Sequence, residues 1–148
     1  YHTTAPEILD QTGGAITHFV TGLGTTGTFT GTGRRLKETN ADIQLISFQP
    51  DSPMHGLEGL KHLPTSIVPD IYDDSLGDAN LFIRTEDAQA MVMRLAQEEG
   101  LLVGLSAGAA VCAALKVAQD LDDGCVVTVM PDGAFKYLDM TFWDKKIN

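Results

Sequence analysis

One junction in this chain limits its fold more than any other feature. A β-rich run over residues 16–21 leads directly into a glycine cluster, and a helical pattern follows over residues 26–38. Glycines at such a junction allow backbone N–H groups to turn inward, and the start of the helix adds a positive dipole. The junction therefore predicts an α/β fold in which a strand leads into an anion-binding turn.

The rest of the chain alternates between strands and helices. Further elements are expected as strands at residues 43–48, 81–84 and 126–130, the last one buried, and as helices at residues 85–99 and 106–121. Thr85 is the expected N-cap of the first of these helices, and Gly100 follows its end. Residues 50–80 form a long irregular loop, which is usually functional or packed against something else. Strands separated by helices imply a mainly parallel sheet with helices on both faces, in a single domain over residues 1–148.

The composition argues against several classes of protein. The formal net charge is −10 at pH 7, whereas nucleic-acid binding depends on clustered Lys and Arg. The cluster of Arg34, Arg35 and Lys37 is expected to complement the negative end of its helix. No apolar run approaches the ~20 residues that cross a bilayer, and no secretory leader is evident. Cys112 and Cys125 are expected to be unreactive thiols, and no metal site is expected. A cytoplasmic protein without a membrane or nucleic-acid partner is the resulting expectation.

The glycine-rich turn has the composition of a phosphate site. Residues 22–28 read G-L-G-T-T-G-T, so the hydroxyls of Thr25, Thr26 and Thr28 lie among three glycines. Backbone N–H groups and hydroxyls together suit a phosphate monoester, whose three free oxygens carry more charge than a pyrophosphate linkage. A tight turn without a ligand is the simpler alternative.

A dinucleotide site is a further alternative, because the same glycines satisfy the pattern G-x-G-x-x-G. That pattern also requires an acidic residue at the end of the next strand, to bind the ribose hydroxyls. Here Asp51 is the nearest such residue, and it lies beyond Pro50. The turn therefore favours a monoester and leaves a dinucleotide-binding domain open.

Five segments resemble, in order, motifs of the cysteine synthase family, especially its B-type branch, among the fold-type II pyridoxal-phosphate (PLP) enzymes. These segments are residues 1–8, the turn and its strand at 17–28, G-L-E-G-L at 56–60, V-G-L-S-A-G-A-A at 103–110, and P-D-G-A-F-K-Y-L at 131–138. The resemblance covers nearly the whole chain. It implies part of the large domain of a tryptophan synthase β-like PLP fold.

The resemblance also implies roles for individual residues. Gly59 would allow the backbone to approach the cofactor ring, and Ser106 would hydrogen-bond the pyridine nitrogen, with a helix N-cap as its alternative or additional role. A serine does not stabilise a protonated ring as a carboxylate does, which suits the elimination of a β-leaving group. The residues implied to hold the PLP phosphate are Gly24, Thr25, Thr26, Gly27 and Thr28.

The implied activity is a β-replacement that forms cysteine from O-acetylserine or O-phosphoserine and sulfide, in a homodimeric parent. Family members carry the Schiff-base lysine in an amino-terminal half that is absent here, so no catalytic residue is assigned. Lys61 is the one lysine near an expected cofactor loop. The chain starts at Tyr1 rather than Met, so we expect that something preceded it or was removed, and residues 139–148 depart from the family ending. Alone, the chain is expected to be inactive. A related reaction such as cystathionine synthesis stays open, as does a non-catalytic fragment that binds phosphate, PLP or a partner protein.

Overall fold

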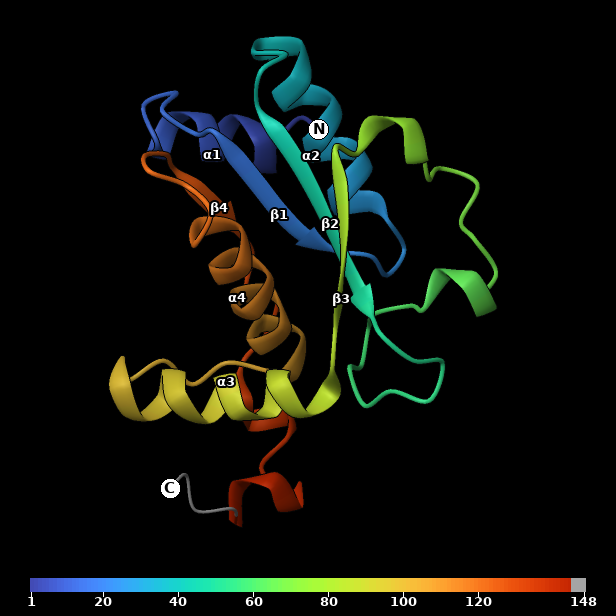
Figure 1. Ribbon diagram of the computed structural model, residues 1–148, viewed down its shortest axis with the longest axis vertical. Helices are drawn as coiled ribbons and strands as arrows, with labels where there is room; N and C mark the ends of the chain where they lie inside the picture. The colour runs from blue at the N-terminus through green and yellow to red at the C-terminus, as the bar shows by residue number, and fades with distance from the viewer. Residues whose placement is uncertain (145–148) are drawn as a thin grey trace.

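The structure is a computed structural model and describes residues 1–144. Its helices and strands follow the chain in this order: α1 (Thr4–Gln11), β1 (His18–Gly22), α2 (Gly27–Thr39), β2 (Gln44–Pro50), β3 (Ala79–Ile83), α3 (Thr85–Glu98), α4 (Leu105–Ala118) and β4 (Val126–Thr128). Short 3₁₀ turns lie at Leu63–Thr65, Asp74–Leu76, Ala134–Lys136 and Thr141–Asp144. The expected strands and helices are therefore present, with ends displaced by a few residues (Figure 1).

The sheet is parallel throughout, as the sequence predicts. Its strand order is β3-β2-β1-β4. Phe19 of β1 lies opposite Leu45 of β2, and His18 lies opposite Val126 of β4. The expectation that the last strand is buried was wrong, because β4 is a half-buried edge strand of three residues that contacts only β1 in the described part of the sheet.

Helices cover both faces of the sheet, which confirms the predicted α/β architecture. Phe19 and Leu45 pack on the side of α1 and α2, whereas Val20 and Ile46 pack on the side of α3 and α4 (Figure 1). Successive strand residues thus enter opposite hydrophobic clusters, as the two-residue repeat of a strand requires. All four side chains are buried, so the central strands are covered on both sides.

Two local expectations were incomplete or wrong. Helix α1 was not predicted, although Ala5 and Ile8 are spaced by three residues and are both buried against α2. Thr85 is the first residue of α3 rather than its N-cap, which is Arg84. The Thr85 hydroxyl instead accepts a hydrogen bond from the backbone N–H of Gly56 (3.0 Å). It therefore connects α3 to the loop that follows β2.

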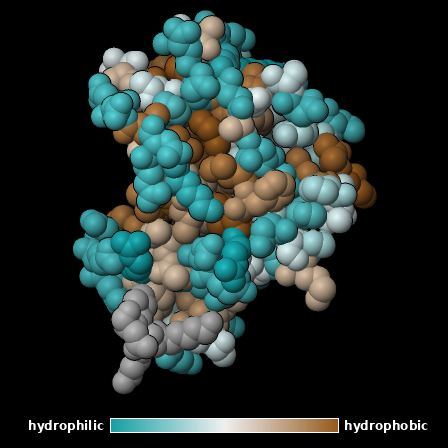
Figure 2. Space-filling view, in the orientation of Figure 1, coloured by the Kyte–Doolittle hydropathy of each residue, from teal (hydrophilic) through white to brown (hydrophobic). Residues whose placement is uncertain are grey.

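The long loop between β2 and β3 is anchored at several points. The side chain of Gln49 accepts a hydrogen bond from the N–H of Leu63 (2.8 Å), and the N–H of Lys61 donates to the carbonyl of Leu23 (2.8 Å). Figure 2 shows hydrophobic side chains at the right-hand edge of one face, over this loop. The exposed hydrophobic residues of the loop are Met54, Ile67, Val68 and Ile71. The expected packing of the loop against another part of the protein would cover them.

Two of the three basic residues of α2 form ion pairs with this loop. Lys37 pairs with Asp78 (2.9 Å), and Arg34 pairs with Asp73 (3.4 Å). The expected interaction with the helix dipole is thus joined by direct contacts that hold α2 to the loop.

At the carboxyl end, the indole Nε1 of Trp143 donates to the carbonyl of Tyr137 (2.8 Å). Phe142 is buried, so residues 139–144 pack on the domain. Lys145 and Lys146, in the segment that departs from the family ending, lie outside the described residues. None of the helices in the described part of the chain has the length and apolar character to cross a membrane.

Candidate functional site

The turn between β1 and α2 holds one residue in an unusual conformation. Thr26, the N-cap of α2, has φ +65° and ψ 0°, in the left-handed region that β-branched residues avoid. It is 2% exposed, and its Oγ1 has no hydrogen-bond partner among the described residues. The N–H groups of the first turn of any helix also lack helical acceptors. A strained residue and unpaired donors together indicate a place prepared for an acceptor group.

Two glycines bring a second loop against this turn. A Cβ atom at Gly24 would lie 2.2 Å from the carbonyl oxygen of Gly59, so the two backbones meet only because Gly24 has no side chain. Gly59 has φ +82°, which favours glycine. A Cβ at Gly59 would meet nothing within 4 Å. That side of Gly59 therefore borders open space.

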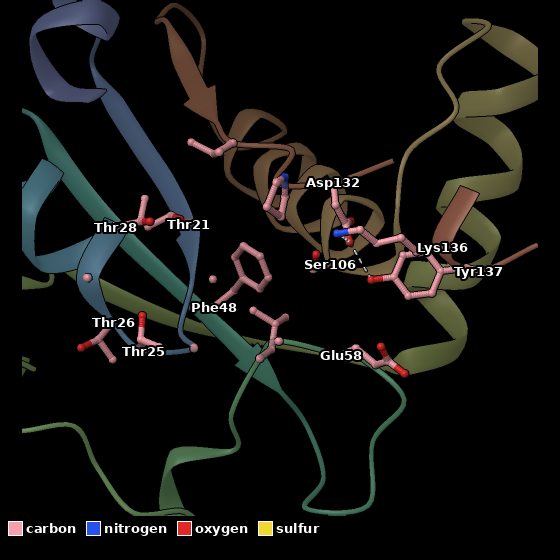
Figure 3. A pocket seen from close by; sticks show the side chains of 17 residues that line it. Thr21, Thr25, Thr26, Thr28, Phe48, Glu58, Ser106, Asp132, Lys136 and Tyr137 are labelled. Atoms are coloured by element: carbon pink, nitrogen blue, oxygen red, sulfur yellow. Dashed lines mark hydrogen bonds and ion pairs between the residues drawn. The ribbon is translucent and has the colours of Figure 1, made fainter. Parts of the chain in front are cut away.

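Gly59 also lines a cavity of about 460 Å³ at the carboxyl end of β1. All seven residues proposed from the sequence line it: Gly24, Thr25, Thr26, Gly27, Thr28, Gly59 and Ser106. In Figure 3 the threonines lie at one end of the cavity and Ser106 lies at the other, with the ring of Phe48 between them. The fold thus brings together residues that lie up to 82 positions apart in the sequence, from Gly24 to Ser106.

Ser106 reaches the cavity from the start of α4. Helix α4 begins at Leu105, and its N-cap is Gly104. The alternative that Ser106 is itself the N-cap was therefore wrong, because Ser106 lies inside the first turn. Ser106 is buried and lines the cavity. Its hydroxyl is thus available to a molecule bound there.

Three lining residues carry interactions that the sequence did not assign. The hydroxyl of Tyr137 donates to Oδ2 of Asp132 (2.8 Å), and Nζ of Lys136 lies 3.4 Å from the same oxygen. Burial, together with the hydrogen bond to Asp132, raises the pKa of Tyr137 to about 12. Oδ1 of Asp132 is buried without a partner among the described residues. The motif at residues 131–138 was recognised, but it gave no signal for this arrangement.

The other candidates from the sequence lie elsewhere. Lys61 does not line the cavity. Burial raises the pKa of the Cys112 thiol to about 11, which fits an unreactive side chain. Cys125 is half-buried, and neither cysteine forms a disulfide. Residues 1–144 contain no group of His, Cys, Asp or Glu side chains suited to a metal ion.

The residues that line the cavity fit a phosphorylated, ring-shaped ligand. The unpaired Oγ1 of Thr26 and the start of α2 suit an anion, and the contact between Gly24 and Gly59 leaves room for a flat group beside the backbone. Ser106, at the opposite end, offers an uncharged hydroxyl. Pyridoxal phosphate combines these features, since its phosphate and its ring nitrogen lie at opposite ends of one molecule.

Comparison with known proteins agrees with this fit. A sequence family described as "Pyridoxal-phosphate dependent enzyme" matches residues 1–132. The cysteine synthase of Aquifex aeolicus is 47% identical over 150 residues, which cover 99% of this chain and 46% of that protein.

Solved structures of similar enzymes also resemble this chain in fold. The cysteine synthase of Entamoeba histolytica superposes with a TM-score of 0.91 at 30% identity, over 99% of this chain and 46% of that one. The O-acetylserine dependent cystathionine beta-synthase of Helicobacter pylori gives a TM-score of 0.82 at 42% identity, over 93% and 47%. The chain spans about half the length of the curated relatives it matches. By its sequence, fold and cavity, the chain belongs to the family of pyridoxal-phosphate dependent enzymes, and within that family it is similar to cysteine synthases.

Proposed function

We propose that this chain is the carboxyl-terminal part of the PLP-binding large domain of a β-replacement enzyme. The parent enzyme would form cysteine from an activated serine, O-acetylserine or O-phosphoserine, and sulfide. One observation carries the proposal: Thr26, strained and with an unpaired hydroxyl, lies at a helix start that faces a cavity ending in Ser106. The similarity to cysteine synthases supports the choice of reaction.

The turn would hold the phosphate group. Thr25, Thr26, Gly27 and Thr28, at the start of α2, line one end of the cavity. Each can donate a hydrogen bond to a phosphate oxygen, and the helix dipole favours the negative charge. Gly24 and Gly59 would keep the two loops close, so that the ring lies beside backbone rather than side chains.

Ser106 would receive the other end of the ligand. The cofactor, when bound, supplies an electron sink that weakens bonds at the Cα and Cβ atoms of an amino-acid substrate. The Ser106 hydroxyl would donate a hydrogen bond to the ring nitrogen without adding charge. An uncharged hydroxyl would leave the cofactor ring a weaker electron acceptor than a carboxylate would. A weaker acceptor suits a reaction in which a β-leaving group departs and is replaced.

We infer that no lysine of residues 1–144 binds the cofactor covalently. Lys136 lines the cavity, but it pairs with Asp132 at the Ser106 end (Figure 3). Lys61 lies outside the lining. We therefore propose that the covalent lysine belongs to an amino-terminal part of the parent and that this chain alone is inactive.

Borohydride trapping tests this assignment. The chain is incubated with PLP, reduced, and mapped by mass spectrometry, with and without the amino-terminal half of the parent. We expect sparse labelling of surface lysines in the chain alone, and an absorbance band in the visible range and cysteine formation when the amino-terminal half is supplied. A single saturable adduct on Lys61 or Lys136 of the chain alone would contradict the proposal, and so would the absence of any cofactor band with both halves present.

The alternatives have separate predictions. A dinucleotide site would need Asp51, but this residue does not line the cavity, and its N–H donates to the carbonyl of Ile83 (3.1 Å). Asp51→Ala would weaken nucleotide binding only if that alternative holds. A non-catalytic binding fragment would bind PLP or a partner protein specifically without turnover. Cystathionine formation would appear as a preference for a thiol amino acid over sulfide. We also propose that the parent protein is cytoplasmic and forms a homodimer.

A further inference from the structure

The Ser106 end of the cavity holds a charged cluster beyond the serine itself. This cluster, called the Asp132 cluster, consists of Asp132, Lys136 and Tyr137. Oδ2 of Asp132 accepts a hydrogen bond from the Tyr137 hydroxyl (2.8 Å) and pairs with Nζ of Lys136 (3.4 Å). Figure 3 shows the three side chains beside Ser106, at the end of the cavity away from Thr25 and Thr26.

The backbone attaches the Asp132 cluster to the start of α4. The N–H of Gly104 donates to the carbonyl of Asp132 (3.0 Å), and Val103 forms an antiparallel bridge with Gly133. A Cβ atom at Gly104 would lie 1.9 Å from Oδ1 of Asp132, so this oxygen touches the backbone two residues before Ser106. The carboxylate and the Ser106 hydroxyl are therefore held in fixed relation.

A carboxylate in this place has an electrostatic consequence for a bound ring. An uncompensated negative charge stabilises a protonated nitrogen nearby and raises its pKa. Glu58, from the loop after β2, lines the same cavity, and so adds to the negative charge. Lys136 is the one cation in the described lining. The dipole at the start of α4 also offsets the charge of Asp132.

We propose that the positive charge of Lys136 neutralises Asp132 while the Tyr137 hydroxyl holds the carboxylate in place, so that Ser106 meets an unprotonated ring nitrogen. The inference rests on the proposed function, because it requires PLP to bind with its nitrogen at Ser106. Lys136 and Tyr137 are positioning residues in this role, since they act through Asp132. The Asp132 cluster would thus keep the ring nitrogen unprotonated, which leaves the cofactor a weaker electron acceptor and matches a hydrogen bond from Ser106.

The test uses the complete enzyme, loaded with PLP that carries ¹⁵N at its ring nitrogen. The nitrogen chemical shift, followed against pH, reports protonation without any dependence on activity. In Lys136→Met the protonation midpoint should rise by about 0.5–1 pH unit, less than the 1–3 units of a direct charge contact, because Ser106 rather than Asp132 would contact the ring. Lys136 is more than half exposed, so this variant is expected to fold.

Matched variants show whether a change in the midpoint comes from the charge of the Asp132 cluster or from the loss of any positive charge. Lys136→Arg should restore the original midpoint. Lys136→Met combined with Asp132→Asn should also return close to it, because both charges are then absent. Lys116→Met removes the same charge from α4, ten residues and about 15 Å along the helix from Ser106. It should leave the midpoint unchanged.

The outcomes distinguish this inference from the proposed function. If the wild-type enzyme does not bind PLP at all, the proposed function fails. If PLP binds and the midpoint is the same in Lys136→Met and the wild type, the inference about the cluster is wrong while the proposed function stands. An equal rise in Lys116→Met would also overturn the inference, because the effect would then not depend on the cluster.

Discussion

Replacing Thr26 with glycine should make the protein more stable and bind PLP less tightly. Thr26 adopts φ +65°, which costs a non-glycine residue about 1–2 kcal/mol. Its buried Oγ1 has no partner in the described part of the chain, which costs a further 1–3 kcal/mol, roughly. Thr26→Gly removes both penalties.

Two losses oppose this gain. Glycine has more conformational freedom in the unfolded chain, which costs about 0.5–1 kcal/mol. The variant also loses two buried carbon atoms, Cβ and Cγ2, worth about 0.8 kcal/mol each. In the absence of cofactor, the free energy of unfolding should therefore rise by about 1 kcal/mol, the difference between the centres of these ranges. The same substitution removes a hydrogen bond to a charged phosphate, which should weaken PLP binding roughly 10- to 150-fold.

Urea denaturation without PLP measures the first effect, and a fluorescence titration with PLP measures the second. Thr32→Gly is the matched control, because Thr32 is equally buried but lies within α2. It should destabilise the protein by about 1–2 kcal/mol, since glycine weakens a helix interior and packing is lost. A Thr26→Gly protein that is less stable, or that binds PLP as well as the wild type, would refute the assignment of Thr26 as a strained phosphate ligand.

Three further predictions concern the cavity and the thiols. Gly24→Ala should cost about 1–3 kcal/mol of stability, because the new Cβ would lie 2.2 Å from the Gly59 carbonyl oxygen. Gly27→Ala, whose Cβ would meet nothing closer than 3.7 Å, should be tolerated in the same denaturation experiment. The pKa of Tyr137 is raised to about 12, so its contribution to stability is complete below pH 10 and is lost as the pH rises towards 12. Unfolding experiments should show this loss, and Tyr137→Phe should abolish it; an identical pH profile in the variant would count against the assigned cause. Finally, Ellman's reagent at pH 8 should modify Cys125 before Cys112, whose pKa is raised to about 11 by burial. Faster reaction of Cys112 would contradict its burial.

The parts of the fold that depend on local repeats could be predicted from the sequence. The strand, glycine turn and helix at residues 16–38 follow from β-branched residues, glycines and helical spacing, each of which acts locally. Helix α1 shows the limit of this approach. Its eight residues carry only two buried positions, Ala5 and Ile8, and burial of these against α2 is a tertiary effect.

The candidate site divides in the same way. The grouping of Gly24 to Thr28 at one end of the cavity was predictable, because these residues are contiguous and their composition is specific. The Asp132 cluster was not, since the turn that pairs Asp132 with Tyr137 is joined by a bridge from Gly133 to Val103, which is 30 residues away. The prediction that Thr85 is an N-cap was wrong for a similar reason, because its hydroxyl accepts a hydrogen bond from the N–H of Gly56, which is 29 residues away.

An NMR titration tests the central claim most directly, by following the backbone amide signals of the ¹⁵N-labelled chain as PLP is added. Binding of the phosphate at the turn and of the ring at Ser106 predicts saturable shifts concentrated at residues 24–28, Gly59 and Ser106, and no comparable shifts with NADH. Shifts scattered over the surface, or an equal response of residues 24–28 to NADH, would contradict the proposal that this cavity is a pyridoxal-phosphate site.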